Sequence, residues 1–260
     1  MVYYDSRYLL IHLAVKYKGD YDRILLAIQT HEEVPFEEAI KTYESLKCKV
    51  ITLLDYDYPV KLKQVFRPPF VLFYYGDISL LDKRIIATVG SRTVNEVGKL
   101  STEKVLEEIA PGNVVISGLA RGIDKIAHIS AINNRARTIA VLGSGIDYVY
   151  PAENRYLYEI IKKNHLVISE YPGDVPPTPT SFPARNRIVV ALSDCVFVPQ
   201  INDYATGTMI SINIGANMGK PVIIAPHPFY SKTINNRIID EGAIIALDGK
   251  QIREELGWKD

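Results

Sequence analysis

Four arginines occupy contexts that favour the binding of an anion. Arg92 belongs to the stretch "VGSR" and Arg121 to "SGLARGID", where glycines allow backbone N–H groups to approach an anion closely. Arg185 and Arg187 belong to "FPARNR", which leads into the apolar run "IVVALS" and is typical of a helix start. The N-terminus of a helix favours negative charge. Two cations there indicate an anion supplied from outside the chain.

Short apolar, β-branched runs predict the strands that would position these arginines. Segments with helical periodicity, such as "KLSTEKVLEEIA" and "GIDKIAHISAI", lie between the runs. Runs that are apolar on both faces and alternate with helices indicate a mostly parallel sheet that is covered on both sides. The sequence therefore predicts an α/β fold with an extended Rossmann-like domain. The predicted strands are 85–90, 114–117, 138–143, 166–171, 195–200 and 221–226, with 243–247 as a candidate for one more.

The turns that follow these strands should meet at one edge of the sheet, because ligands of such folds bind at the carboxyl ends of the strands. Tyr148, Tyr150, Tyr171 and Phe182 should lie near the same edge. Cations beside aromatic rings suit single-stranded nucleic acid, which places phosphates on the charges and bases on the rings. A lone arginine at a strand end is, however, more often a surface residue or an ion-pair partner. Phe182 and Tyr150 are equally well explained as packing residues.

The two arginines of "FPARNR" cannot both face one groove in a regular helix, since they stand about 200° apart around it. The alternative is that one of them forms an ion pair within the protein. The candidate partners are Asp124, Asp147 and Glu170.

Several classes of site are not indicated. The turn after the first predicted strand lacks the GxGxxG fingerprint, and neither a GxxxxGK[ST] loop nor a GxSxG elbow occurs. Cys48 and Cys195 have no metal-ligand spacing with the five histidines. We therefore expect binding without catalysis, and neither a cofactor nor a metal. There are 30 basic and 30 acidic residues, so any anion site must be a local cluster.

The chain divides into two predicted parts. Residues 1 to about 50 follow helical spacing, and residues 51–84 form a proline- and aromatic-rich connector that ends in the short strand "FVLFYY". We predict a small helical domain with its connector over 1–66 and the Rossmann-like domain over 67–260. No signal peptide and no apolar run of membrane-spanning length occurs, which favours a cytoplasmic protein.

Five ordered motifs resemble one family. These are "VGSR", "SGLARGIDKIAH", "TIAVLGSGIDYVYPAEN", "ISEYP" and "FPARNRIVVALSD". In this order and spacing they are similar to the DNA-processing protein A family, also called DprA or Smf. The resemblance implies a small helical domain before an extended Rossmann fold, binding and protection of single-stranded DNA, and loading of RecA recombinase during natural transformation. It also implies a homodimer without catalytic activity.

The resemblance also implies which residues form the DNA groove. They are Gly90, Ser91, Arg92, Ser117, Gly118, Arg121, Gly122, Arg185, Asn186 and Arg187. To these the predicted edge adds Phe182, Gly207 and Thr208.

The chain departs from the family pattern at several points. Ala152 stands where the family is often basic, the fifth strand ends in Gln200 where a glutamate is usual, and the next turn reads "ATGTMIS". The C-terminal winged-helix domain of many members is expected to be absent.

Two other functions remain open. One is a nucleotide-processing hydrolase like the phosphoribohydrolases, whose "PGGxGT" turn is partly matched by "YATGTM". The other is a nucleotide-sensing module.

Overall fold

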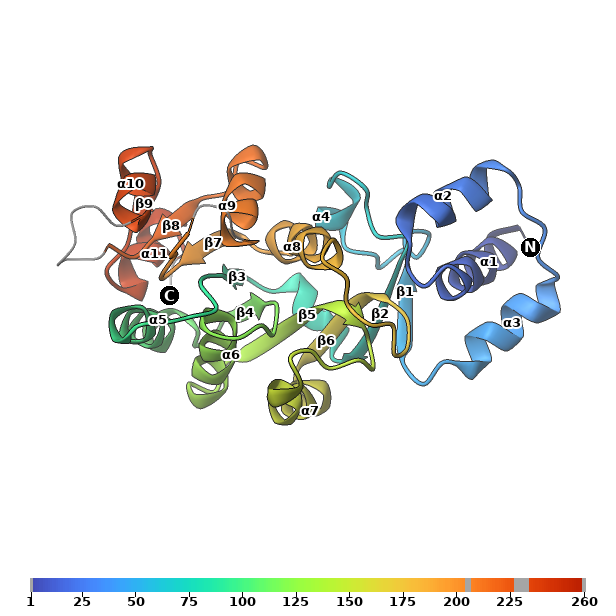
Figure 1. Cartoon of the computed structure of the whole chain (residues 1–260), viewed down its shortest axis with the longest axis horizontal. Coiled ribbons are helices and arrows are strands. Elements are labelled where there is room, and N and C mark those ends of the chain that lie inside the picture. Colours follow the sequence, from blue (N-terminus) through green and yellow to red (C-terminus); the bar gives the residue numbers. More distant parts are fainter. Residues whose placement is uncertain (1, 204–206, 227–233, 259–260) are drawn as a thin grey trace.

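The computed structural model describes residues 2–203, 207–226 and 234–258. Three helices form a unit at one end of an elongated molecule, as the N-terminal periodicity predicted (Figure 1). They are α1 (Val2–Lys16), α2 (Tyr21–Gln29) and α3 (Phe36–Ser45). Asp20 caps α2 by accepting a hydrogen bond from the backbone N–H of Arg23 at 3.1 Å. Leu10, Leu13 and Ala14 of α1 are buried beside α2.

The rest of the chain is built around one nine-stranded sheet with the order β1-β2-β6-β5-β4-β3-β7-β8-β9. All pairings from β6 through β9 in this order are parallel, so the predicted α/β fold with a mostly parallel sheet is confirmed. The strands are β1 (Lys49–Thr52), β2 (Val71–Gly76), β3 (Ile85–Thr88), β4 (Val114–Ser117), β5 (Arg137–Gly145), β6 (Leu166–Tyr171), β7 (Cys195–Val198), β8 (Val222–Ile224) and β9 (Ile244–Ile245).

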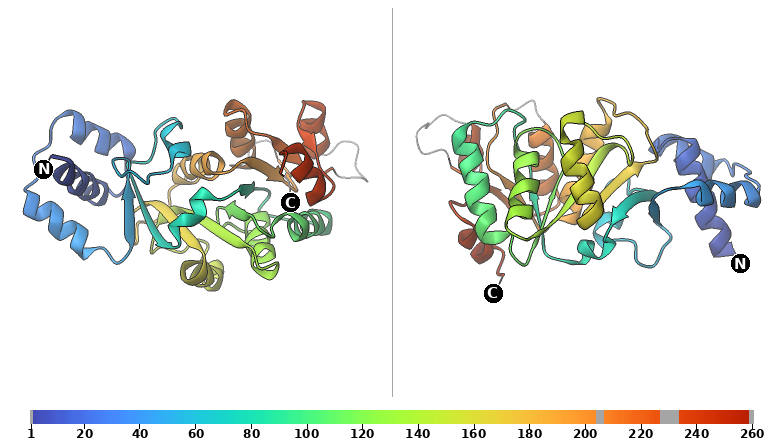
Figure 2. Two further views of the ribbon diagram at one scale, coloured as in Figure 1. Left: turned by 180° about the vertical axis from the view of Figure 1, so that it is seen from behind. Right: turned by 90° about the horizontal axis from the view of Figure 1, so that it is seen from below.

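Helices cover both faces of the sheet (Figures 1 and 2). One face carries α4 (Val60–Lys63), α8 (Ser181–Leu192), α9 (Gly207–Asn217) and α10 (Ile234–Asp240). The other carries α5 (Glu96–Ile109), α6 (Ile123–Asn133), α7 (Arg155–Asn164) and α11 (Gly249–Glu255). This arrangement explains why the strands read as apolar on both faces rather than alternating.

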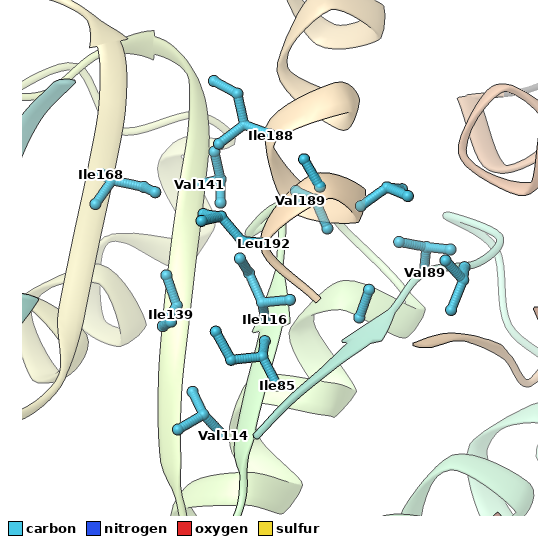
Figure 3. Close-up of a cluster of buried hydrophobic side chains, with 14 of the residues drawn as sticks. Ile85, Val89, Val114, Ile116, Ile139, Val141, Ile168, Ile188, Val189 and Leu192 are labelled. Carbon is cyan, nitrogen blue, oxygen red and sulfur yellow. The ribbon is translucent and has the colours of Figure 1, made fainter. Parts of the chain in front are cut away.

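Helix α8 lies on the centre of the sheet (Figure 3). Its Ile188, Val189 and Leu192 pack on Ile116 of β4 and Val141 of β5, and all five are almost inaccessible to solvent. Complete burial of such a side chain contributes about 1.5–3 kcal/mol. The apolar second half of α8 therefore holds the first half, which carries "FPARNR", in place at the edge of the sheet.

The first two strands join the sheet in the antiparallel sense. β1 pairs with β2, and β2 pairs with β6 through contacts such as Phe73 with Ser169. The last helix of the helical unit ends at Ser45, and the sheet begins at Lys49. The domain boundary predicted between residues 66 and 67 falls between β1 and β2, which pair with each other. Within the described part of the chain, no helix combines the length and apolar character needed to cross a membrane.

Candidate functional site

A cleft lies at the point where the order of the strands reverses. From β3 the chain adds β4, β5 and β6 on one side, and then returns through α8 to place β7 on the other side of β3. Ligands of open α/β sheets bind outside the carboxyl ends of the strands at such a point. A cleft of about 900 Å³ occurs there, between the turn after β3, the turn after β4 and the first halves of α8 and α9.

The cleft brings together most of the residues predicted to bind DNA. Those that line it are Gly90, Ser91, Arg92, Gly118, Phe182, Arg185, Asn186, Gly207 and Thr208. Arg121 borders a smaller adjoining hollow, together with Arg92, Tyr150 and Phe182. Ser117, Gly122 and Arg187 line neither space. Residues 204–206 of the predicted turn 202–208 lie outside the described residues.

Arg92 provides an exposed positive charge at the cleft. Its guanidinium carbon lies 5.5 Å from the centre of the Phe182 ring, which suits a cation–π contact. The Phe182 ring centre lies 5.6 Å from that of Tyr150, with the two ring planes tilted by 42°. The cleft thus presents a cation and an aromatic surface side by side.

Arg185 is a buried cation beneath the same surface. Only 6% of the residue is exposed, its Nη1 donates to the carbonyl oxygen of Val141, and its Nε donates to Asn186 Oδ1 at 3.1 Å. Burial lowers the pKa of Arg185, while the neighbouring Asp124 acts in the opposite direction. Burial likewise raises the pKa of the Asp124 carboxyl, against the effect of Arg185. The two charges therefore compensate each other inside the protein.

The turn after β4 is shaped around this pair of charges. Asp124 accepts hydrogen bonds from the backbone N–H groups of Gly118 at 3.1 Å and Ala120 at 3.3 Å. A Cβ atom on Gly118 would lie 2.0 Å from Nη1 of Arg185, so a larger residue there would displace the guanidinium or the turn that passes over it. Asp124 thus ties down the loop, while its charge compensates that of the buried Arg185.

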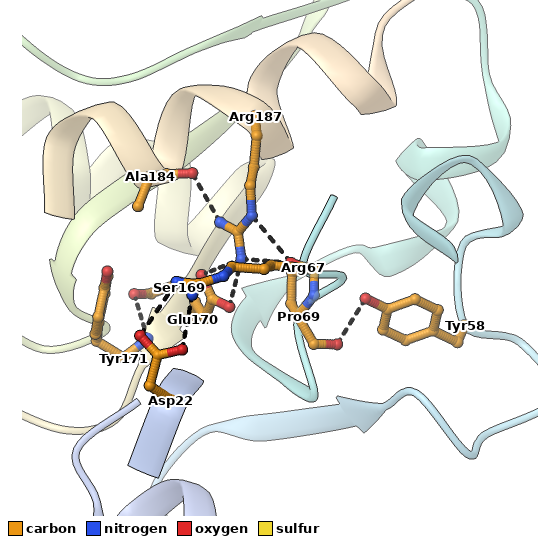
Figure 4. Close-up of polar contacts among 9 residues, drawn as sticks. All are labelled: Asp22, Tyr58, Arg67, Pro69, Ser169, Glu170, Tyr171, Ala184 and Arg187. Carbon is orange, nitrogen blue, oxygen red and sulfur yellow. Dashed lines mark hydrogen bonds and ion pairs between the residues drawn. The ribbon is translucent and has the colours of Figure 1, made fainter. Parts of the chain in front are cut away.

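Arg187 does not line the cleft and instead reaches Glu170 and Arg67 (Figure 4). Its Nη2 lies 2.6 Å from Glu170 Oε1 at the end of β6, and it also donates to the carbonyl oxygen of Arg67 at 2.9 Å. The sequence left open whether both arginines of "FPARNR" face one groove or one of them forms an internal ion pair. The contact between Arg187 and Glu170 confirms the internal ion pair. Helix α8 begins at Ser181, so both arginines lie beyond the first turn, where the dipole effect has largely decayed.

Two further predicted residues support the loops rather than line the cleft. Ser117 is fully buried and its Oγ donates to the carbonyl oxygen of Thr88 at 2.7 Å. Gly122 has a φ of 72°, and a Cβ atom there would lie 2.2 Å from the carbonyl oxygen of Ser91. Both residues therefore hold the turns after β3 and β4 close together.

The sequence interpretation missed the support that Gln200 and Asn202 provide. The backbone N–H of Asn202 donates to Ser91 Oγ at 2.8 Å, and its Nδ2 donates to the carbonyl oxygen of Thr93 at 2.8 Å. Gln200 accepts a hydrogen bond from the backbone N–H of Asn95 at 3.1 Å and donates to Asn202. These contacts clamp the turn that carries Arg92. No sequence motif points to them, because they join segments far apart in the chain.

The carboxylate of Asp124 and the imidazole of His128, near the cleft, are both engaged in internal contacts. Among the described residues that line it, Asp124 is the one carboxylate, and it is occupied as stated above. His128 is buried beside Thr138, with Nδ1 and Oγ1 2.7 Å apart, and burial lowers its pKa to about 3. The described residues contain no group of three or more histidine, cysteine, aspartate or glutamate side chains placed to hold a metal ion. The cleft therefore offers anion-binding and ring-stacking groups.

Known proteins with similar sequences and structures are named DNA processing protein A, or DprA, which is the family that the five sequence motifs resemble. The chain is 35% identical over 222 residues to the DNA processing protein DprA of Streptococcus pneumoniae, covering 85% of this chain and 78% of the relative. It is 34% identical to DprA of Bacillus subtilis, covering 84% and 74%. The crystal structure of the S. pneumoniae protein superposes with a TM-score of 0.77 at 29% identity, covering 98% of this chain and 96% of that one.

A second solved structure is DNA processing protein A from Helicobacter pylori, which was described for its single-stranded DNA binding mode. It superposes with a TM-score of 0.72 at 29% identity, covering 82% of this chain and 96% of that one. The sequence model described as DNA recombination-mediator protein A matches residues 49–257, which include every strand and the whole cleft. The chain therefore belongs to the DNA recombination-mediator protein A family, DprA/Smf.

Proposed function

We propose that this protein binds single-stranded DNA in the cleft at the carboxyl ends of β3, β4 and β7. The observation that carries the proposal is the exposed Arg92 lying over the ring of Phe182 where the strand order reverses. A phosphate can pair with the guanidinium while a base stacks on the ring. Arg185 supports the cleft from below as a buried cation whose charge Asp124 compensates, and Arg187 serves the fold instead of the DNA.

In its cellular role, the protein would protect incoming single strands and load RecA recombinase onto them in the cytoplasm, acting as a homodimer without catalytic chemistry. Membership of the recombination-mediator family supports this role, as does the single-stranded DNA binding described for the H. pylori relative. RecA assembly on single-stranded DNA should proceed faster with the protein than without it. Sedimentation of the protein alone would test the dimer.

The binding proposal is tested by titrating single- and double-stranded DNA of equal length over about 50 to 200 mM salt. When the logarithm of the affinity for the single strand is plotted against the logarithm of the salt concentration, the slope should be about −0.7 per phosphate neutralised. Arg92→Ala should lower the affinity and flatten this slope by about 0.7. Arg23→Ala is the matched control, because Arg23 also lies over a ring, that of Tyr17 at 4.6 Å, but belongs to α2 in the N-terminal unit. Wild-type affinity and slope in Arg92→Ala would refute the assignment of the cleft.

The same protein sample can distinguish the binding of single-stranded DNA from the two other functions, a nucleotide hydrolase and a nucleotide sensor. A hydrolase would release free base from nucleoside monophosphates, and a sensor of small nucleotides would bind a mononucleotide as tightly as a long oligonucleotide. The engaged carboxylate of Asp124 disfavours the hydrolase, which needs a free catalytic acid. Calorimetry with both ligands should instead show affinity that increases with oligonucleotide length.

A further inference from the structure

Cations and aromatic rings continue from the cleft onto the neighbouring surface. Phe182, which carries Arg92 above its ring, is in contact with Tyr150. Tyr150 borders the small hollow that also contains Arg121. The cleft therefore does not end at Phe182 but opens towards the turn after β5, which carries Tyr150.

Beyond this opening the same alternation of charge and ring is repeated. Arg121 pairs with Glu153, with Nη2 and Oε2 3.0 Å apart, and Lys125 of α6 lies with its Nζ 5.5 Å from the ring centre of Tyr156 of α7. Helices α6 and α7 cover the same face of the sheet (Figure 2). The Tyr150 and Tyr156 residues are 45% and 50% exposed, so both rings are accessible.

We propose that single-stranded DNA leaving the cleft continues along this surface, named here the outer track and formed by Tyr150, Arg121, Lys125 and Tyr156. The inference rests on the proposed binding of single-stranded DNA in the cleft. Its specific basis is the alternation of cations with accessible rings, since an unpaired strand presents phosphates and base faces in turn. A duplex hides its base faces and can use only the charges.

Glu153 limits the affinity of the outer track. Its carboxylate holds Arg121 in an ion pair, and Arg121 and then Lys125 hold the pKa of Glu153 below its ordinary value. A DNA phosphate must compete with this carboxylate for the guanidinium. Both side chains are about half exposed, so the pair adds little to the stability of the fold and can be altered without unfolding the protein.

The test measures the affinity for oligo-dT over a range of about 4 to 16 nucleotides, which spans the site sizes of typical single-strand binding folds. Tyr156→Ala and Lys125→Ala should leave the affinity for the shortest oligonucleotides unchanged. Tyr156→Ala should weaken the binding of the longest about fivefold or more, because a stacked base is lost. Lys125→Ala should weaken the binding of the longest as well and flatten its salt dependence by about 0.7, because a phosphate contact is lost. Tyr56→Ala and Lys250→Ala are matched controls, because these residues are exposed and lie in the connector and in α11.

Glu153→Gln tests the competition separately. It should strengthen the binding of long oligonucleotides and steepen their salt dependence by about 0.7, because Arg121 becomes available to a phosphate. Unchanged binding of long oligonucleotides by Tyr156→Ala and Lys125→Ala would overturn the outer track, as would equal losses on short and long ones. Unchanged or weaker binding by Glu153→Gln would overturn the role of Glu153. If the wild-type protein bound no oligo-dT of any length, the proposed function itself would fail.

Discussion

Replacement of Arg187 by leucine should destabilise the protein by about 3–5 kcal/mol, because it leaves the carboxylate of Glu170 buried without a counter-charge. The side chains of Arg187 and Glu170 are only 14% and 8% exposed, and both carboxylate oxygens contact the guanidinium. Each kcal/mol lowers the melting temperature of a chain of this size by about 2–4 °C, so the midpoint should fall by roughly 6–20 °C.

The loss should depend on pH in a defined direction. Burial raises the pKa of Glu170, and Arg187 counteracts this rise. Without Arg187 the folded protein should hold the carboxyl proton to a higher pH than the unfolded chain does. Stability of the variant, relative to the wild type, should therefore fall as the pH rises from the pKa that Glu170 has in the folded wild type through the higher pKa that it has in the variant. Urea denaturation at about pH 5 and pH 7.5 should show the larger deficit at the higher pH.

Two variants test the cause of the deficit. Glu170→Leu combined with Arg187→Leu should recover most of the stability, because no charge is left buried. Arg121→Leu is the matched control, since it breaks an Arg–Glu pair of similar geometry whose members are about half exposed, and it should be nearly neutral. Equal effects of Arg187→Leu and Arg121→Leu, or a double variant as unstable as the single one, would refute the reasoning.

Three further predictions concern the support of the cleft. Gly118→Ala should weaken the binding of single-stranded DNA, because its Cβ atom would displace the guanidinium of Arg185 or the turn above it; an unchanged Kd in the titration would contradict this. Gln200→Ala should lower the affinity without altering the salt slope, because it loosens the turn that carries Arg92 but removes no charge; a flatter slope would contradict it. His128→Asn should reduce the loss of stability on acidification. In the wild type the pKa of His128 is lowered from 6.5 to about 3, so below its ordinary pKa the unfolded chain takes up a proton that the folded chain does not. This should cost the wild type about 1.4 kcal/mol per pH unit relative to the variant, and equal slopes in urea denaturation would count against it.

The repeating part of the fold could be predicted from local sequence. β3, β4 and β5 are apolar runs followed by glycine or serine, and the reversal of strand order then places their turns at one edge. That is sufficient to bring Arg92, Phe182 and Arg185 to one cleft. β1 and its pairing were not predicted, since "KVIT" becomes a recognisable strand only when β2 lies beside it.

The partners of the individual arginines could not be assigned from sequence. Arg185 and Arg187 are two residues apart on α8, yet one lies beneath the cleft and the other faces β6. Which acid each contacts depends on the rotation of α8 on the sheet, and that is set by the packing of residues such as Val189. The sequence could only offer Asp124, Asp147 and Glu170 as candidates. Asp147 proved to accept a hydrogen bond from Tyr75 at 2.8 Å.

The antiparallel docking of β2 on β6 has a consequence for synthesis of the chain. β2 leaves the ribosome long before β6, and its register, such as Phe73 with Ser169, cannot form until β3, β4 and β5 have also emerged. Contacts between such distant segments slow folding. Until β6 is synthesised, the apolar strands β1 and β2 lack the neighbour that β2 pairs with in the finished sheet, and exposed apolar strands favour aggregation. We therefore expect the chain to be most prone to misfolding while it is being synthesised. Substitutions in β6 should reduce the yield of newly made protein more than their effect on the finished fold would suggest.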